Sequence, residues 1–247
     1  MKVLFYPDKI RKRVISLNEL ICQRMKWHMT TDINDRWDFS FYWNFNEKNV
    51  TPKELMDDKR LVFNRRCNDV TKSKVDRVFK NVFGYTSEGN TNRYGYCVKK
   101  NEGQCKKDFE IVNTPCENKQ GYFYQIFFNN RIKVNWTREY RFYICMDKSI
   151  MVVRDKTVEG TFIPKKGKQE TFVDDVRNHF TRDEQEKIME VCNLLGLDLG
   201  AVDVIRDYST GKVYVLDINN ICGYATPVTN LVIEPFEKLI YDKAMSV

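Results

Sequence analysis

Three oxygen-bearing side chains near the end of the chain have the spacing of a binding site for a hard metal ion. Asp217 and Asn219 are two residues apart in an apolar run, so a β-strand there would place both side chains on one side. The turn signal at 208–211 would bring Asp203, on a preceding strand, nearly opposite Asp217. Two carboxylates and an amide oxygen, with no His or Cys among them, favour Mg²⁺, which keeps several waters and shares phosphate oxygens.

The same pattern has a plainer interpretation. Strand alternation places Val213 and Val215 on the side of Asp217, behind the polar groups. On this interpretation Asp203 and Asp217 are the polar side of an amphipathic hairpin at a sheet edge. The spacing alone leaves both interpretations open.

A resemblance to a known family bears on the choice. The segment 196–223 resembles the end of the ATP-grasp domain, in which a strand bearing Asp leads to a hairpin, then to Glu/Asp-x-Asn and a Gly-containing loop. This chain has Asp at 217 where Glu is more usual, and Cys222 where a proline commonly precedes the glycine. The resemblance implies ATP as cofactor with Mg²⁺, or Mn²⁺ as the alternative ion. The matching positions are Asp203, Asp217, Asn219 and Gly223.

The resemblance also implies lysines that contact the phosphates of ATP. Lys74 stands at the opening of a helix where such enzymes place one lysine, and the end of the strand 96–100 offers Lys99 and Lys100 for the next. We prefer Lys100, because alternation along the strand lets only one of the two point into the cleft. The following loop, 101–108, is glycine-rich in many relatives and has one glycine here.

Two further features complete the resemblance. The run 122–128 resembles the strand and hinge whose backbone pairs with adenine, and Arg141 and Arg154 resemble arginines directed towards the γ-phosphate and the acceptor. The alternative for the arginines is ion pairing with Glu139 and Asp155 at the surface, where such pairs contribute little. The hinge positions are Gln125, Ile126 and Phe127.

These residues require a particular set of elements to position them. The first seventy residues read as short strands alternating with helices, and the part from 96 to 154 reads as antiparallel strands in a row. A polar loop at 157–170 precedes a helix that opens with the capping box Thr181 to Glu184 and ends at Gly196. With the resemblance, we expect an α+β ATP-grasp fold, two α+β subdomains holding ATP between antiparallel sheets after a reduced α/β N-terminal layer. The expected boundaries are 1–68 for that layer and 69–247 for the ATP-grasp domain, divided into a nucleotide-binding part 69–128 and a metal and catalytic part 129–247.

Composition narrows the class of protein. The net charge of +7 suits a nucleotide, a nucleic acid or an acidic membrane surface, but no RNP-type or zinc-finger pattern points to nucleic acid as partner. Eight cysteines without a Cys-x-x-Cys pair favour free thiols in a reducing cytoplasm. No segment approaches the length of a membrane span, so we expect no membrane insertion. The oligomeric state stays open between monomer and homodimer.

The implied activity is that of a carboxylate-amine ligase, in which ATP converts a carboxylate to an acyl phosphate that an amine or another nucleophile attacks. The partners would be ATP and an unidentified small-molecule or polymer acceptor. One alternative is an ATP-grasp phosphotransferase acting on a small molecule or glycan. Another is a non-catalytic nucleotide- or nucleic-acid-binding protein that keeps the fold, suggested by the net charge and the single glycine of the loop.

Overall fold

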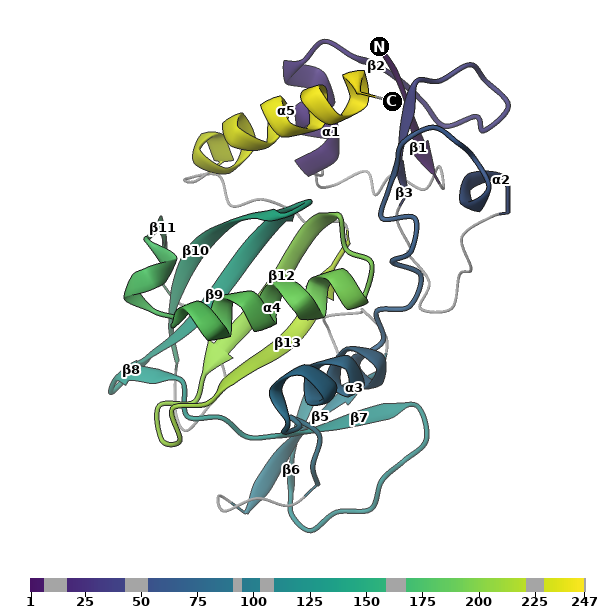
Figure 1. Cartoon of the computed structure of the whole chain (residues 1–247). Helices are drawn as coiled ribbons and strands as arrows, with labels where there is room; N and C mark the ends of the chain where they lie inside the picture. Colours follow the sequence, from purple (N-terminus) through teal and green to yellow (C-terminus); the bar gives the residue numbers. More distant parts are fainter. Residues whose placement is uncertain are drawn as a thin grey trace.

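The computed structural model describes residues 1–6, 17–42, 53–90, 95–102, 109–158, 168–220 and 229–246. They form three β-sheets with helices between and around them (Figure 1). The loop residues 103–108 and the predicted positions Cys222 and Gly223 lie outside the described residues. None of the described helices is long and apolar enough to cross a membrane.

The N-terminal layer is a small parallel sheet, as the alternating strands and helices predicted. Its four strands are β1 (Lys2–Tyr6), β2 (His28–Thr30), β3 (Phe39–Tyr42) and β4 (Val62–Phe63), in the order β2-β1-β3-β4. The accompanying helices are α1 (Leu17–Arg24) and α2 (Lys53–Met56). Val3, Leu4 and Phe5 are all fully buried, which is the pattern of a parallel strand covered on both faces. Strand β2 has three residues, which are too few to show the two-residue alternation that marks a strand in a sequence.

The second sheet is antiparallel and follows helix α3 (Lys72–Phe83). Thr71 caps the start of α3, and Gly84 ends it in the left-handed conformation, at φ 79°. The sheet has the order β6-β5-β7, with β5 (Tyr96–Asn101), β6 (Phe109–Asn113) and β7 (Tyr122–Ile126). Strand β7 ends earlier than predicted, so the connection to the next sheet starts at Phe127.

The third and largest sheet carries most of the predicted site. Its order is β11-β10-β9-β12-β13, with β8 also paired to β9. The strands are β8 (Arg131–Lys133), β9 (Trp136–Cys145), β10 (Lys148–Thr157), β11 (Gln169–Val173), β12 (Leu199–Arg206) and β13 (Val213–Asn219). The prediction of successive antiparallel strands from 96 to 154 is confirmed, and the chain changes sheets between β7 and β8. Part of the predicted loop 157–170 is also strand, since β10 runs to Thr157 and β11 begins at Gln169.

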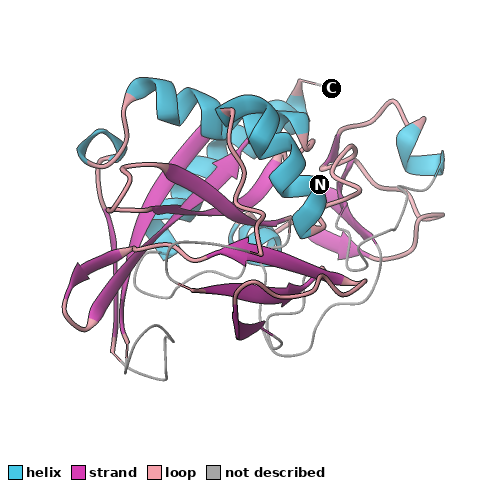
Figure 2. Cartoon of the chain, turned by 90° about the horizontal axis from the view of Figure 1, so that it is seen from below, coloured by secondary structure: helices cyan, strands magenta, loops and turns pink. Residues whose placement is uncertain are grey.

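The two faces of the large sheet pack against different layers. One face carries Phe142 and Val202, which share a core with Phe79 of α3 and Ile188 of α4 (Arg182–Leu194). Helix α4 has the predicted capping box, in which the Thr181 side chain and the backbone N–H of Glu184 meet. In Figure 2 most helices gather over one side of the strands.

The opposite face of the large sheet packs against the N-terminal layer at one end. Tyr143 and Leu199 there belong to a second core with Phe41 of β3 and Phe236 of the C-terminal helix α5 (Thr229–Met245). Figure 1 shows α5 lying beside α1, at the N-terminal layer. This face therefore has an apolar end under the N-terminal layer, and its other end is left for polar side chains.

Candidate active site

The polar end of this face is built by four neighbouring strands. Asp203 on β12 is the register partner of Asp217 on β13 and of Arg141 on β9, and Ala201 is the partner of Asn219. Directly opposed residues of antiparallel strands point to the same face, so these polar side chains share it. The predicted juxtaposition of Asp203 with Asp217 is confirmed by this register.

A β-bulge changes what lies behind the acids. The pairing of β12 with β13 shifts between Asp203 and Val204, so that Val204 pairs with Val215. The extra residue on β13 reverses the alternation. Val213 and Val215 therefore join Val204 in the core under α3 and α4, on the face opposite to Asp217. The prediction that the two valines share the face of Asp217 is wrong, because it assumed an uninterrupted strand.

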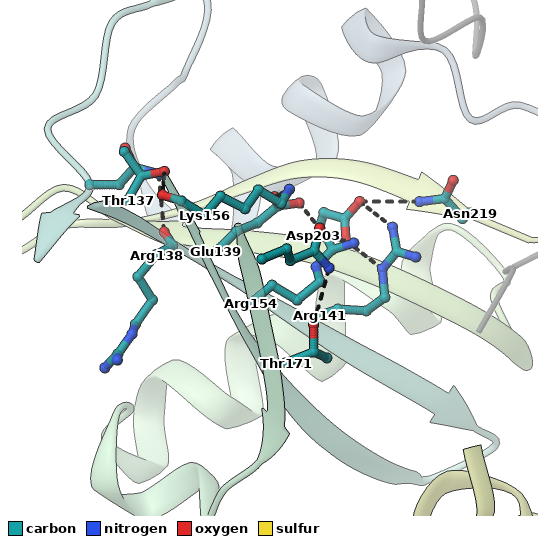
Figure 3. A network of polar contacts seen from close by, with 11 residues as sticks. Thr137, Arg138, Glu139, Arg141, Arg154, Lys156, Thr171, Asp203 and Asn219 are labelled. Carbon is teal, nitrogen blue, oxygen red and sulfur yellow. Dashed lines mark hydrogen bonds and ion pairs between the residues drawn. The ribbon is translucent and has the colours of Figure 1, made fainter. Parts of the chain in front are cut away.

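The carboxylate of Asp203 is held by two arginines. Arg141 donates from Nε to Oδ1 and from Nη2 to Oδ2, both at 2.7 Å, and Arg154 donates from Nη2 to Oδ1 at 2.6 Å (Figure 3). Asn219 Nδ2 lies 3.5 Å from Oδ2, with its amide oxygen turned away from Asp203. Asp203 and Arg141 are 6% and 7% exposed. The arginines are thus desolvated members of the site, not surface residues.

Glu139 is a member of this site that the sequence interpretation treated only as a surface partner. It accepts hydrogen bonds from Arg154 and from Lys156, and its side chain is mostly covered. Asp155 instead pairs with Arg138, at 2.7 Å for each of two bonds. Because Asp155 follows Arg154 along the strand, it points to the other face. The short turn that pairs Cys145 with Lys148 also sets Glu139 opposite Arg154, and this pairing is the signal that would have identified Glu139 as a site residue.

The two neighbouring lysines of β5 point in opposite directions. Lys99 lies 3.0 Å from a carboxylate oxygen of Glu110 and over the ring of Tyr122, 4.1 Å from its centroid. Lys100 interacts electrostatically with Asp217, Glu139 and Asp203 across from it on the large sheet. Burial of the Lys100 ammonium lowers its pKa to about 8, and these three carboxylates oppose that shift. Lys100 is therefore the lysine of β5 that faces these three carboxylates, which we call the acidic row.

Helix α3 contributes a lysine that the sequence interpretation did not select. Lys72 adds to the lowering of the Lys100 pKa by like-charge repulsion, so the two ammonium groups lie near each other. Lys74, the predicted residue, is half-buried, and its backbone N–H donates to Thr71 Oγ1 at 3.4 Å. Side chains two positions apart on a helix point in different directions. The described contacts thus place Lys72, rather than Lys74, beside Lys100.

The predicted hinge residues lie at the end of β7. The Gln125 side chain is buried and donates to Ser87 Oγ at 3.3 Å, and Ser87 in turn donates to Asp76 at 2.6 Å. Ile126 donates its backbone N–H to the Ser87 carbonyl at 2.8 Å. Phe127 packs edge-on against Tyr96, with ring centroids 5.1 Å apart. The Gln125 side chain therefore anchors the strand, and any ligand contact at this position falls to the backbone.

The donor set can be compared with the needs of Mg²⁺. Within the described ranges no three His, Cys, Asp or Glu side chains cluster as a metal site, so an ion here would rely on two carboxylates, an amide oxygen, waters and ligand phosphates. Asp217 and Asn219 fit this requirement from one face of β13. The two oxygens of Asp203 already accept three guanidinium hydrogen bonds, which compete with a cation for the same lone pairs.

Comparison with known proteins shows which fold these strands and helices form. No protein-family model and no curated protein matches the sequence. Among solved structures, the ATP-grasp ligase PsnB complexed with a phosphomimetic variant of its minimal precursor, Mg and ADP is 11% identical, with TM-score 0.62 and 98% of both chains covered. The macrocyclase MdnC from Microcystis aeruginosa, bound with precursor peptide MdnA, is 12% identical, with TM-score 0.61 and full coverage of both chains.

A third similar structure acts on a different kind of substrate. The D-alanine–D-alanine ligase from Bacillus anthracis complexed with ATP is 11% identical, with TM-score 0.59, covering 100% of this chain and 96% of the other. The chain therefore has the ATP-grasp fold that its sequence predicted. At these identities the similarity establishes the fold alone.

Proposed function

We propose that this chain, which has the ATP-grasp fold, is a Mg-ATP-dependent ligase that activates a carboxylate as an acyl phosphate for attack by an amine or another nucleophile. The observation that carries the proposal is the electrostatic interaction of Lys100, on the small sheet, with Asp217, Glu139 and Asp203, on the large one. A lysine and a row of carboxylates from two sheets are the components that a phosphate chain with its metal ion requires. Solved structures of ligases with this fold, complexed with ATP or with ADP and Mg, support the cofactor assignment.

The residues of the large sheet would have distinct tasks. Asp217 and Asn219 would hold Mg²⁺, with Asp203 as the third candidate, and the ion would supply neutralisation of phosphate charge. Arg154 would bind the transferred phosphoryl group. Arg141, whose orientation is set by its two bonds to Asp203, would orient the acceptor carboxylate. A fixed guanidinium needs little reorganisation when charge develops in the transition state.

The residues of the small sheet and α3 would bind the nucleotide. Lys100 would contact the phosphates, with Lys99 as the less favoured candidate because Glu110 engages it. Lys74 stays a candidate for the first phosphate lysine. The backbone of Gln125, Ile126 and Phe127 would pair with adenine. We propose the same division as in the sequence prediction, with residues 1–68 as a separate layer and 69–247 as the ATP-binding domain.

The proposed chemistry needs no protein nucleophile. A carboxylate oxygen of the acceptor attacks the γ-phosphorus, the bond from that phosphorus to the oxygen of ADP breaks, and an acyl phosphate forms. The nucleophile then attacks the acyl carbon, loses a proton and expels inorganic phosphate. Catalysis rests on positioning and charge neutralisation. Because MdnC is bound with a precursor peptide and PsnB with a variant of its minimal precursor, a peptide side-chain carboxylate is the acceptor to test first.

The test measures ADP release against peptides and small molecules that carry carboxylates and amines. We expect Mg²⁺-dependent ADP release that Asp217→Ala or Asn219→Ala lowers by about a hundredfold or more, the effect of losing one transition-state contact. Glu186→Ala is the matched control, because Glu186 is an exposed carboxylate on α4. ADP release that is equal in all three variants would refute the metal assignment.

Product analysis separates ligase from phosphotransferase. A ligase yields a joined or cyclised product with one water lost and releases inorganic phosphate. A phosphotransferase leaves a stable product heavier by one phosphoryl group and releases no phosphate. Replacing Mg²⁺ by Mn²⁺ in the same assay tests the alternative ion.

A further inference from the structure

A cavity outside the proposed ATP site is lined mainly by cations. It has a volume of about 390 Å³ and lies where the segment 59–66, the end of α4 and the end of α5 meet. Its acidic lining residue is Asp198. Asp198 lies five residues before Asp203 in the sequence, roughly 16 Å along an extended strand, so the cavity is separate from the acidic row. The cationic lining residues are Lys59, Arg60, Arg65, Arg66 and Lys243.

Two of these cations are fixed by neighbouring protein groups. Arg60 donates to Asp58 from Nε at 2.9 Å, to the Trp37 carbonyl at 3.0 Å, and stacks over the Trp37 ring. Arg65 donates to the carbonyls of Met56 and Arg60, at 3.3 and 2.6 Å. Arg60 thus has a carboxylate partner, and the hydrogen bonds to backbone carbonyls hold the Arg65 side chain in place.

The other three cations of the cavity have no carboxylate partner of their own among the described residues. Within the described part of the chain, the side chains of Lys59, Arg66 and Lys243 make no hydrogen bond or ion pair. The carboxylate of Asp198 accepts a hydrogen bond from the Asn64 backbone N–H at 2.8 Å, and burial raises its pKa despite the nearby Arg66 and Arg65. The cavity therefore gathers more positive charge than the single carboxylate of Asp198 offsets, and like charges in a concave site repel one another unless an anion binds.

The walls of the cavity are held in place by two backbone features. Asn64, fully buried at φ 62°, accepts from the N–H groups of Asp198 and Leu199, both at 2.9 Å, and donates to the Leu199 carbonyl at 2.7 Å. Gly196 lies against the backbone of Arg66, so closely that an added Cβ would be 2.6 Å from the Arg66 carbonyl carbon. Arg65 and Arg66 are therefore anchored on a segment clamped to the large sheet.

We propose that this cavity binds a small anion with a pyrophosphate group, either free or as part of a nucleotide. Arginine forks and lysine ammonium groups match phosphate oxygens, and a volume near the lower end of the range for ligand sites fits such a group rather than a folded polymer. The anion would join the end of α5 to the segment 59–66 by cancelling the repulsion between Lys243 and the cations of that segment. This site does not depend on the function proposed for the acidic row.

The test is isothermal titration of inorganic pyrophosphate at constant ionic strength, using the full chain with Lys100→Met to weaken the proposed ATP site. We expect one binding site, and we expect Arg66→Ser or Lys243→Gln to weaken the affinity by about tenfold each, the value of one charge-assisted contact. Lys238→Gln removes a positive charge from the exposed side of the same helix and should change the affinity by less than about twofold. The unfolding midpoint of each variant shows that the fold is retained.

Two results would overturn the proposal. One is the absence of pyrophosphate binding in the Lys100→Met protein, and the other is an affinity that Arg66→Ser and Lys243→Gln together leave unchanged. An ADP titration distinguishes the sources of the group. If ADP competes with pyrophosphate in this background, the ligand is a nucleotide, and if it does not, the ligand is the free anion.

Discussion

The guanidinium of Arg141 and the carboxylate of Asp203 form a two-bond ion pair, each bond 2.7 Å long, between the register partners of β9 and β12. Arg154 adds a third bond to the same carboxylate. A residue predicted as a metal ligand is thus, in this structure, also the anchor of both predicted catalytic arginines. Asp203 links the metal end of the site to its arginine end.

This ion pair predicts a large loss of stability when one partner is removed. Asp203→Ala removes the carboxylate that Arg141 and Arg154 share, and breaking such a buried pair costs about 3–5 kcal/mol of the free energy of unfolding. Urea denaturation measures it. Asp217→Ala is the comparison variant, because Arg141 and Arg154 donate to Asp203. Equal losses in both variants would contradict the anchoring role of Asp203.

A double change isolates the pair itself. Arg141→Met with Asp203→Leu replaces both charges by apolar groups, so it should restore part of the stability that either single change removes. Strict additivity of the two single losses would mean that the residues do not interact.

The two lysines of β5 predict different effects on nucleotide binding. Lys100→Met removes the ammonium that faces the acidic row and should weaken ATP affinity by about tenfold or more, the worth of one charge-assisted contact. Lys99→Met removes the ammonium that pairs with Glu110 and should leave the affinity within about twofold. Titration with a non-hydrolysable ATP analogue and Mg²⁺ measures both. A greater loss in Lys99→Met would reverse the assignment.

The lowered pKa of Lys100 predicts a pH dependence. In the protein without nucleotide, Lys100 is charged below a pKa of about 8 and loses its proton as the pH rises through that value. If Lys100 contacts phosphate, the affinity for ATP should fall between pH 7.5 and 9.5, since binding must then include protonation. Lys100→Arg stays charged over the whole range and should remove most of this dependence. An unchanged pH profile in Lys100→Arg would assign the dependence to another group.

Asn64 predicts a stability effect at the junction of the segment 59–66 with the large sheet. Its side chain makes hydrogen bonds to backbone groups of Asp198 and Leu199, and its φ of 62° lies in the left-handed region. Asn64→Ala loses the bonds and adds backbone strain, whereas Asn64→Gly loses the bonds only. We therefore expect Asn64→Ala to be less stable than Asn64→Gly by about 1 kcal/mol in urea denaturation. Equal stability of the two variants would show that the backbone conformation relaxes.

Local patterns in the sequence carried much of the fold. The Thr181 to Glu184 capping box and the hairpin turn before β13 both depend on residues within a few positions, and the structure has both. The order of motifs was sufficient for the ATP-grasp fold, which the structural comparison confirms. The bulge that turns Val215 away from Asp217 was not readable, because nothing in the local sequence marks it.

Contacts between distant segments decided the rest. Which lysine of β5 faces the acids depends on how the small sheet packs on the large one, and the bonds between Asp203 and its arginines depend on β12 pairing with β9, some sixty positions earlier in the chain. The sequence by itself determined the types of group available, namely carboxylates, lysines and arginines in ATP-grasp order. Only the tertiary structure decided which of them meet, because sheet register and packing are set by non-local burial and hydrogen bonding that residue spacing does not encode.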